Sequence, residues 1–511
     1  LPNEFDRIIA EMGGTELNAF TSNDMTVYLN KFPPNQIEKW LDVYVHRFQK
    51  PVFRLFQSEL ETVYEEKNRS MNEPIQYLIE RYTAKMFAGH PYGEQTTLGK
   101  TAHLKNPSLK AMYDYYNKYY VANNMALVLA GDFKSEDIIE LINQKLSQFP
   151  KSNLKKEENF TITSIKGKRE ETLKSSPVKM AIYGFRIDGQ NKIDQAKIDL
   201  LLALLQNDSE TGLIDQLRTN GKVMASQIFE YTLEEQGSIA ILNIPKLIGQ
   251  SFEKAEVLLF AQLDSLKQGK FSDDLFNSVK NELVKYKKTT FEDNEDLSRI
   301  VYDYFISHED WNKVINYESN LEALTKANLI EYANQIFKED YVVLYSKMGK
   351  TKMEKLKKPP FKAIPSKNSQ KSKYYDFYNE IETTALTVDY VNFEEDIKSI
   401  QLNAKTQLNH TLNPKNDVFD LTYSWNIGSV ELPSLAPLAS YLNLIGTSEK
   451  KFNVFRKELQ NLNASYYIDV DDKNFSLMID GEDKNLAKTV ELITNLLVSP
   501  AKDESKLKEV V

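Results

Sequence analysis

The sequence predicts an α+β protein made of repeated units, in which helices cover sheets of antiparallel type. Apolar residues recur mostly at helical spacing, as Ile37, Leu41 and Val45 do, and short apolar or alternating runs lie between the helices. An order of helix, hairpin and helix occurs near both ends of the chain, which indicates an internal repeat. The 511 residues, 41% of them hydrophobic, suit about three to four domains with apolar cores.

Composition argues against several classes of protein. With 64 Lys+Arg and 73 Asp+Glu the net charge is −9, which argues against general nucleic-acid binding. The absence of cysteine excludes disulfides, a thiolate zinc site and a cysteine nucleophile. The longest aliphatic runs, such as residues 200–205, are far shorter than the ~18 residues of a membrane span. No signal pattern is visible after Leu1, and this start predicts a processed or partial chain.

Residues 1–150 form the first predicted unit. Two strands, 16–21 and 25–32, are expected on either side of the turn Ser22-Asn23-Asp24. The fully apolar run 125–130, which ends at Gly131, predicts a buried strand. Helical spacing predicts helices over 5–12, 36–48, 55–68, 77–87, 108–120 and 136–149.

Residues 151–349 form the second predicted unit. Its expected strands are 179–185, 227–232, 238–244 and 341–345. Its expected helices are 193–205, 213–220, 251–268, 272–288, 294–306 and 321–337.

A linker rich in lysine and proline is predicted over 350–385. Residues 350–373 contain nine lysines and three prolines against one glutamate, which is typical of an extended connection between domains. A basic interaction patch is the alternative interpretation of the same lysines.

Residues 386–511 form the third predicted unit, with strands at 408–412 and 419–427 and a partial repeat of the first unit. Leu462-Asn463-Ala464 matches Leu17-Asn18-Ala19, and each copy continues with a hairpin and an amphipathic helix. The prolines that follow, Pro51 and Pro500, lie 449 residues apart. At this separation Lys508 takes the position of Glu59, and the second copy ends before the counterpart of Glu66.

Two carboxylates of the predicted helix 55–68 are candidates for chemistry. Glu59 and Glu66 are seven residues apart, so they share one helical face with Val63. Such a pair could coordinate a cation or orient a ligand, whereas a solvated acidic face is the ordinary alternative. No two of the five histidines have the i, i+4 spacing of a zinc-binding helix; they are His46, His90, His103, His308 and His410.

Four segments together resemble the pitrilysin/insulinase family of zinc metallopeptidases, the inverzincins. They are residues 13–28, the helix with Glu59 and Glu66, His90-Pro91-Tyr92-Gly93, and residues 119–132. The resemblance implies two homologous halves that form a clamshell around a chamber. It also implies zinc as the cofactor and a zinc-dependent metalloendopeptidase that degrades peptides or oligopeptides in the closed chamber.

The resemblance assigns roles to single residues. By position, Glu66 resembles the third zinc ligand and Glu59 the acid that supports the site. The residues that resemble the family's substrate-capturing edge strand, to which a peptide adds as a further strand, are Asn18, Ala19, Phe20 and Thr21. A purely structural role in the hairpin is the alternative for Asn18.

The chain also departs from the family's pattern. The family's two histidine ligands and its general base come from an H-x-x-E-H helix, but no histidine precedes Asn18. In the second copy Pro437, Ser440 and Tyr441 occupy the motif positions, so this half is expected to be non-catalytic. The chain is therefore expected to be the central part of a larger protease, incomplete at both ends and inactive alone.

Two functions remain open. The first is part of an active endopeptidase, whose partners are peptide substrates and the N- and C-terminal parts of the same protein, with no nucleic acid and no membrane span. The second is a non-catalytic relative that acts as a partner subunit or peptide-binding scaffold. A periplasmic or other extracytoplasmic bacterial location would fit peptide scavenging, although no signal sequence is visible.

Overall fold

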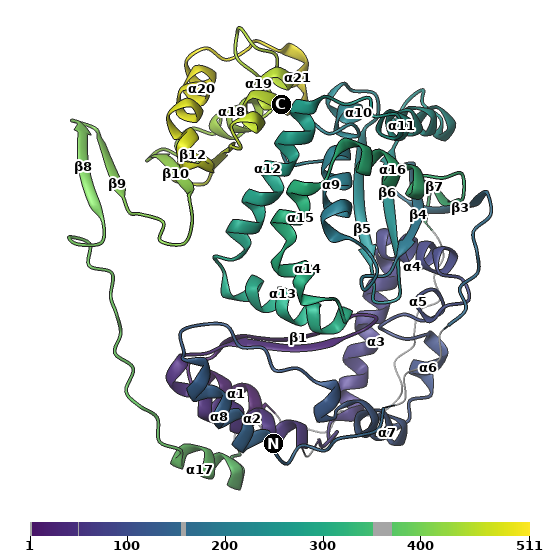
Figure 1. The fold of residues 1–511 in the computed structure, drawn as a ribbon, viewed down its shortest axis with the longest axis vertical. Helices are drawn as coiled ribbons and strands as arrows, with labels where there is room; N and C mark the ends of the chain where they lie inside the picture. The colour runs from purple at the N-terminus through teal and green to yellow at the C-terminus, as the bar shows by residue number, and fades with distance from the viewer. Residues whose placement is uncertain (1–2, 50, 155–159, 351–369, 511) are drawn as a thin grey trace.

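The computed structural model describes residues 3–49, 51–154, 160–350 and 370–510 and confirms the predicted α+β fold. In Figure 1 the first unit (purple to blue) lies below the large sheet of the second unit (teal). The third unit (green to yellow) lies above and to one side, and a long extended segment leads up to it from the bottom of the molecule.

The first unit contains one antiparallel hairpin among helices. β1 (Thr15–Thr21) pairs with β2 (Thr26–Lys31), with Asn18 opposite Leu29 and Phe20 opposite Val27. One face of the hairpin packs through Leu17 and Tyr28 on a core formed with the first two helices. The helices are α1 (Glu4–Glu11), α2 (Ile37–Gln49), α3 (Phe56–Asn72), α4 (Pro74–Met86), α5 (Pro91–Glu94), α6 (Thr101–Lys105), α7 (Leu109–Tyr119) and α8 (Ser135–Leu146), with short 3-10 turns η1 (Pro34–Gln36) and η2 (Ala122–Asn124).

The strand predicted over 125–130 is wrong. These residues are irregular, and none of them is fully buried. A strand requires a neighbour that bonds its N–H and C=O groups, and among the described residues the sheet of the first unit contains only β1 and β2. An apolar run therefore did not suffice to define a strand here.

The second unit is built on a five-stranded sheet of order β3-β7-β4-β6-β5. Only the pair β3–β7 is parallel. The four predicted strands are confirmed. The edge strand β3 was not predicted, because its sequence KREETLKSS is mostly polar. The bounds are β3 (Lys168–Ser176), β4 (Met180–Asp188), β5 (Ala225–Thr232), β6 (Gln236–Ile244) and β7 (Tyr341–Met348).

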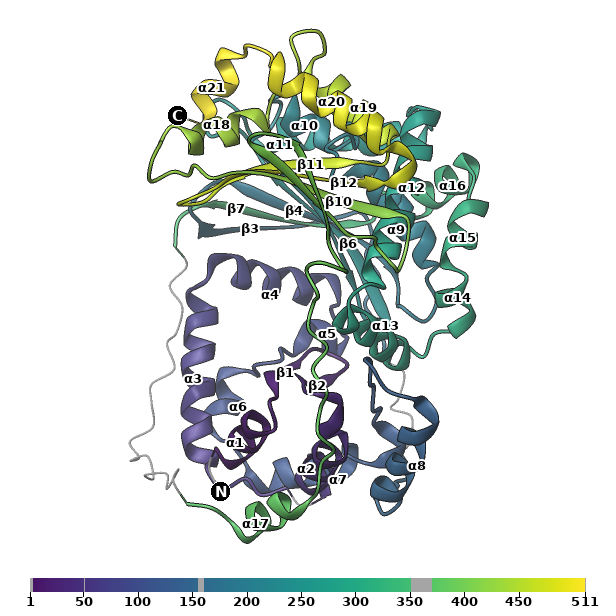
Figure 2. The ribbon, with the colours of Figure 1, turned by 90° about the vertical axis from the view of Figure 1, so that its left-hand side faces the viewer.

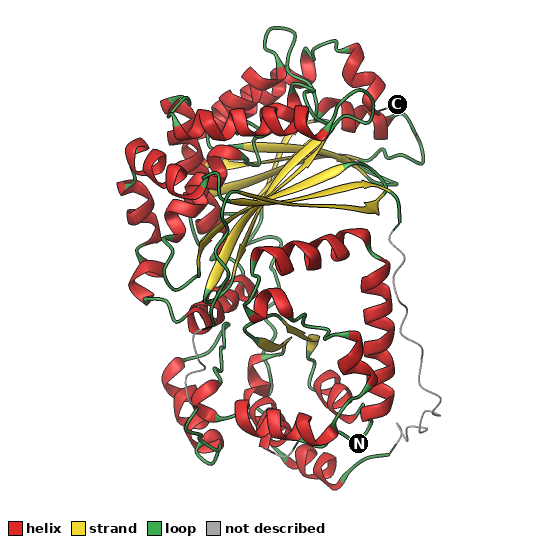
Figure 3. Cartoon of the chain, turned by 90° about the vertical axis from the view of Figure 1, so that its right-hand side faces the viewer, coloured by secondary structure: helices red, strands yellow, loops and turns green. Residues whose placement is uncertain are grey.

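Helices cover both faces of this sheet, as Figures 2 and 3 show. α4 of the first unit packs on one face, where Tyr82 and Met86 join Val342 and Leu344 in one cluster. The other face carries the main core, which includes Leu204. Its helices are α9 (Gln195–Leu205), α10 (Asp215–Thr219), α11 (Phe252–Lys267), α12 (Asp273–Thr290), α13 (Asn294–Ser307), α14 (Trp311–Ile315), α15 (Tyr317–Ala323) and α16 (Lys326–Ile336).

The single helix predicted over 321–337 is in fact two helices, α15 and α16. The break occurs at Leu324 and Thr325, whose backbones are extended. Thr325 forms a capping box with Asn328, which satisfies backbone donors at the start of α16. The N-cap residue Thr325 thus starts a new helix within a segment whose apolar spacing had predicted one continuous helix.

The third unit has a three-stranded antiparallel sheet of order β10-β12-β11. Residues 351–369 of the predicted linker lie outside the described residues. In the part that follows, α17 (Lys373–Glu380) packs on the first unit through Tyr375 and Tyr378. The other elements are β8 (Lys398–Asn403), β9 (Thr406–His410), β10 (Val418–Trp425), α18 (Leu435–Leu442), α19 (Phe452–Asn461), β11 (Ser465–Val470), β12 (Phe475–Glu482), η3 (Asp483–Asn485), α20 (Leu486–Val498) and α21 (Glu504–Val510).

The structure confirms the internal repeat and corrects its register. The order α1-β1-β2-η1-α2-α3 recurs as α19-β11-β12-η3-α20-α21. Gly13 and Asn463 each follow the end of a helix with a left-handed backbone, at φ 78° and 51°. Leu462-Asn463-Ala464 therefore corresponds to Met12-Gly13-Gly14 and not to Leu17-Asn18-Ala19. The separation of 449 residues holds between the starts of α2 and α20, whereas the starts of α3 and α21 lie 448 residues apart.

α12 joins the second unit to the third. One face contributes apolar residues to the core of the second unit. The other face bonds to the third unit: Ser278 donates to Asn461 (2.7 Å), Glu282 accepts from Gln460 (2.9 Å) and Lys288 pairs with Asp417 (2.6 Å).

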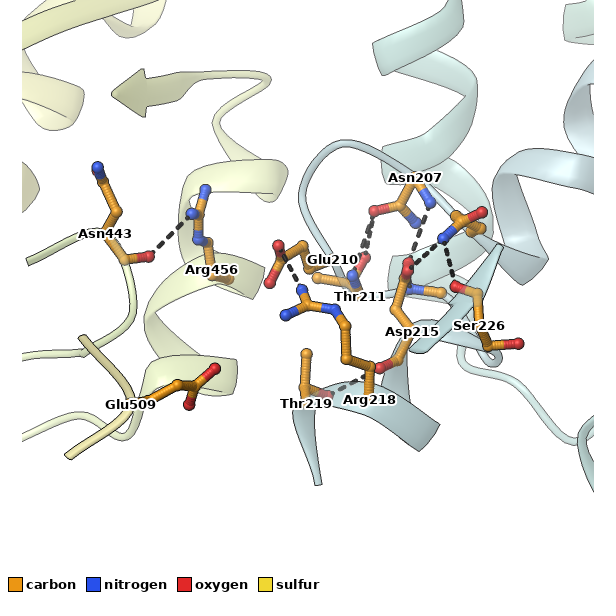
Figure 4. A network of polar contacts seen from close by, with 12 residues as sticks. Asn207, Glu210, Thr211, Asp215, Arg218, Thr219, Ser226, Asn443, Arg456 and Glu509 are labelled. Atoms are coloured by element: carbon orange, nitrogen blue, oxygen red, sulfur yellow. Dashed lines mark hydrogen bonds and ion pairs between the residues drawn. The ribbon is translucent and has the colours of Figure 1, made fainter. Parts of the chain in front are cut away.

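The loop 206–215 lies beside this contact, since Ser209 donates to Glu282. The loop is organised around one buried carboxylate, that of Asp215 (Figure 4). Asp215 accepts hydrogen bonds from the backbone N–H groups of Asn207 (3.0 Å) and Gly212 (3.1 Å) and from the Gln206 amide (3.2 Å). From the same loop, Thr211 donates to Gln460 of the third unit (2.7 Å). Asp215 thus shapes a loop that touches both units.

Candidate functional site

Helix α3 displays the two candidate carboxylates on one exposed face. Glu59 and Glu66 are both exposed, and neither side chain forms a hydrogen bond or ion pair with another described residue. The helix is held elsewhere, because Tyr64 donates to the Leu104 carbonyl (2.6 Å) and Lys67 pairs with Glu80 (3.1 Å). The fold therefore leaves this acidic face open to a ligand or to a further element.

The described residues do not form a complete metal site. No group of three His, Cys, Asp or Glu side chains among them could hold a metal ion. The ring of His46 stacks on Tyr374 with centroids 4.1 Å apart, and His90 is buried beside Glu235. His103, His308 and His410 are exposed. Glu66 would need ligands from outside the described residues to bind zinc.

Strand β1 presents the four residues predicted to bind substrate. In the described part of the chain β1 pairs only with β2, so its other edge has no strand beside it. Asn18, Ala19, Phe20 and Thr21 are all exposed. The Ala19 N–H donates to Oδ1 of Asn18 (2.9 Å), so a side chain of the strand itself engages one of its backbone donors. An open edge of this kind can accept an extended peptide.

In the third unit, helix α18 occupies the place that the H-x-x-E-H helix is expected to have in the first half. α18 carries Pro437, Ser440 and Tyr441, and it packs against β11 and α21. The Tyr441 hydroxyl donates to the Ala501 carbonyl (3.1 Å) and accepts from the Asp503 N–H (2.8 Å), just before α21. Both hydrogen bonds of the Tyr441 hydroxyl are therefore formed with backbone groups.

A polar junction at the tip of the hairpin is not apparent from the sequence. Asp24 accepts from the Tyr92 hydroxyl (2.7 Å) and from the Glu234 N–H (3.0 Å). Burial and the neighbouring Asp24 carboxylate raise the pKa of Tyr92, so its hydroxyl stays protonated and donates. The sequence motif His90-Pro91-Tyr92-Gly93 drew attention to Tyr92, but no sequence pattern indicates that Tyr92 contacts Asp24.

Comparison with protein families identifies the class of protein. The family description "Insulinase (Peptidase family M16)" matches residues 2–99, and "Peptidase M16 inactive domain" matches residues 108–283. The chain therefore belongs to peptidase family M16, the pitrilysin/insulinase family.

Two bacterial relatives carry the name zinc protease. The chain is 25% identical to "Zinc protease PqqE" of Helicobacter pylori over 349 residues, which are 66% of this chain and 77% of the relative. It is 26% identical to "Probable zinc protease PqqL" of Haemophilus influenzae over 348 residues, 63% of this chain but only 36% of that relative. Zinc is accordingly the metal associated with this family.

Solved structures share the fold. A protease from Helicobacter pylori matches with a TM-score of 0.62 at 21% identity, over 67% of this chain and 84% of that one. The periplasmic protease PqqL from Escherichia coli matches with a TM-score of 0.57 at 15% identity, over 99% of this chain and 60% of that one. In the described part of the chain, no helix is long and apolar enough to cross a membrane.

Proposed function

We propose that this chain supplies one zinc ligand and the substrate-binding strand of a zinc-dependent metalloendopeptidase that degrades peptides or oligopeptides in a closed chamber. The observation that carries the proposal is the repeat. In the third unit α18 packs beside α21, and α21 corresponds to α3 of the first unit. A helix placed like α18 in the first half would lie beside α3, the helix that carries Glu59 and Glu66.

In this proposal Glu66 is the carboxylate ligand, and Glu59 supports it from one face of the same helix. The two histidine ligands and the general base belong to an H-x-x-E-H helix that is not among the described residues. The chain alone is then inactive, because one exposed carboxylate does not hold zinc as a three-ligand site does. The missing partners are N- and C-terminal parts of the same protein.

The proposed substrate is an extended peptide that adds to the open edge of β1 along Asn18, Ala19, Phe20 and Thr21. Backbone pairing supplies affinity that does not depend on sequence, which suits degradation of varied peptides. A periplasmic or other extracytoplasmic location is part of the proposal. It rests on the likeness to the periplasmic protease PqqL from Escherichia coli.

A non-catalytic partner subunit or peptide-binding scaffold is the second candidate. The observation that favours it is the edge of β1 that has no neighbouring strand among the described residues. This edge could bind an extended peptide without a metal ligand, and the protein would then bind peptides without cleaving them.

Zinc content and peptidase activity of the protein expressed from its complete gene test the proposal. Wild type should hold one zinc per chain and cleave peptides, and a chelator should stop the cleavage. Glu66→Gln should lower zinc affinity and activity at least about a hundredfold. Glu65→Gln is the matched control, since Glu65 is an exposed neighbour with the same charge on a different side of α3.

The two candidates predict different results. Retention of zinc and activity in Glu66→Gln would show that the ligand assignment is wrong. A folded wild-type protein with neither zinc nor cleavage would support the scaffold.

A further inference from the structure

The tip of hairpin β1–β2 is the meeting point of three segments that are far apart in the sequence. They are the tip itself, the start of α5, and the turn between β5 and β6. The two carboxylate oxygens of Asp24 connect them, because Oδ1 accepts from the Tyr92 hydroxyl and Oδ2 accepts from the Glu234 N–H. Beside it, Oδ1 of Asn23 accepts from the Tyr231 hydroxyl (3.1 Å).

Tyr92 is the central residue of this junction. Its side chain is only 7% exposed, and its hydroxyl lies 2.7 Å from Asp24 and within 3.4 Å of the Glu235 N–H, which donates to it. The Tyr92 hydroxyl can therefore donate to the hairpin and accept from the second unit at once. A hydrogen bond to a charged carboxylate in such a buried place is stronger than an exposed one.

Every residue of the motif His90-Pro91-Tyr92-Gly93 serves to place Tyr92. His90 is 2% exposed; its Nδ1 accepts from the Tyr92 N–H (3.2 Å), so Nε2 carries the hydrogen and donates to Glu235 (2.9 Å). Pro91 begins α5. A Cβ at Gly93 would lie 2.6 Å from the Phe87 carbonyl oxygen, so only glycine fits against the end of α4.

Helix α13 of the second unit lies along the same hairpin (Figure 1). Glu295 near its start pairs with Lys31 at the base of the hairpin (3.2 Å). The ring of Tyr302 lies 6.4 Å from that of Phe20, nearer the tip. These two residues of β1 and β2 share one face of the hairpin, and the other face packs on the first unit. The hairpin therefore contacts the second unit both near its base and near its tip.

We propose that Tyr92 and Asp24 are positioning residues that fix the β1–β2 hairpin against the second unit, so that the open edge of β1 is held in place for an extended peptide. The inference rests on the proposed function for its substrate, but its structural part stands on the junction alone. Removing the Tyr92 hydroxyl leaves the ring and its packing intact, and it should free the tip without unfolding either unit.

Hydrogen exchange and steady-state kinetics of the complete protein test this proposal with Tyr92→Phe. Exchange at backbone amides of residues 16–31 should rise roughly tenfold or more, while amides of α9 stay protected. With an extended peptide as substrate, KM should rise about tenfold and kcat should stay within about twofold, because a loosened strand weakens the substrate and the transition state alike.

Two further variants sharpen the test. Asp24→Ala removes the acceptor of the Tyr92 hydrogen bond. The double variant Asp24→Ala/Tyr92→Phe should therefore exchange only slightly faster than the faster of the two single variants. Tyr466→Phe is the matched control, since Tyr466 is 4% exposed and donates one hydrogen bond (3.0 Å) far away in the third unit. It should change neither the exchange of the hairpin nor KM.

Unchanged hairpin exchange in Tyr92→Phe would overturn the proposal. Faster exchange with wild-type KM and kcat would overturn its part in substrate binding. Absence of cleavage by the wild-type protein would instead refute the proposed function, and the exchange data would still decide whether the junction fixes the hairpin.

Discussion

Lowering the pH from 7 to 4 should stabilise the wild-type second unit relative to an Asp215→Asn variant by about 2 kcal/mol. Asp215 is 4% exposed, and burial raises its pKa from 3.8 to about 6, although the hydrogen bonds from Asn207, Gln206 and Gly212 act in the opposite direction. The folded state therefore binds a proton more tightly than the unfolded state does. Stability from this group is gained as the pH falls through 6 toward 3.8, and it is absent near pH 7.

The magnitude follows from the difference between the two pKa values. One pKa unit corresponds to about 1.4 kcal/mol, so the whole difference is worth about 3 kcal/mol, and about 2 kcal/mol of it falls between pH 7 and pH 4. The Asn variant has no titrating group at this position. Its side-chain amide also presents N–H donors to a loop that already offers backbone donors, so it should be less stable at every pH.

Urea unfolding of both proteins at pH 4, 5, 6 and 7 measures this difference, with the slowest-exchanging amides of α9 as a second probe of the second unit. Asp208→Asn, an exposed acid in the same loop, is the control and should show no such trend. A stability difference between wild type and Asp215→Asn that is independent of pH, or that shrinks as the pH falls, would refute the reasoning.

Two substitutions in the second unit should compare the contribution of core packing to stability with that of a helix N-cap. Leu204→Ala removes a fully buried side chain of α9 and should lower the free energy of unfolding by about 2–5 kcal/mol, measured by urea unfolding. Thr325→Ala removes the capping box of α16 and should cost about 1 kcal/mol in the same assay. Neither residue lies at the hairpin or on α3, so KM for peptides should stay unchanged in both.

Local patterns predicted the helices well, because one buried face decides whether a segment folds as a helix. The spacing of Ile37, Leu41 and Val45 predicted α2, and Leu41 is 2% exposed in its core. Strands depend on partners elsewhere in the chain. Residues 341–345 form β7 because sheet neighbours lie on both sides, whereas the equally apolar run 125–130 has none among the described residues.

The candidate site was predictable only where one element carries it. The seven-residue spacing predicted that Glu59 and Glu66 share a face of α3, since helical geometry alone determines this. That both carboxylates lack partners among the described residues is a property of the tertiary structure. The bond between Asp24 and Tyr92 joins residues 68 positions apart, and no local pattern contains such information.

The contact between α12 and the third unit differs in kind from the apolar packing on its other face. Ser278, Glu282 and Lys288 meet the third unit through hydrogen bonds and an ion pair, which water can replace when the surfaces part. Leu275 and Val279 remain buried in the second unit. The polar contact should therefore respond to ionic strength, because added salt screens the Lys288–Asp417 pair, whereas the apolar packing on the other face of α12 should not weaken in this way.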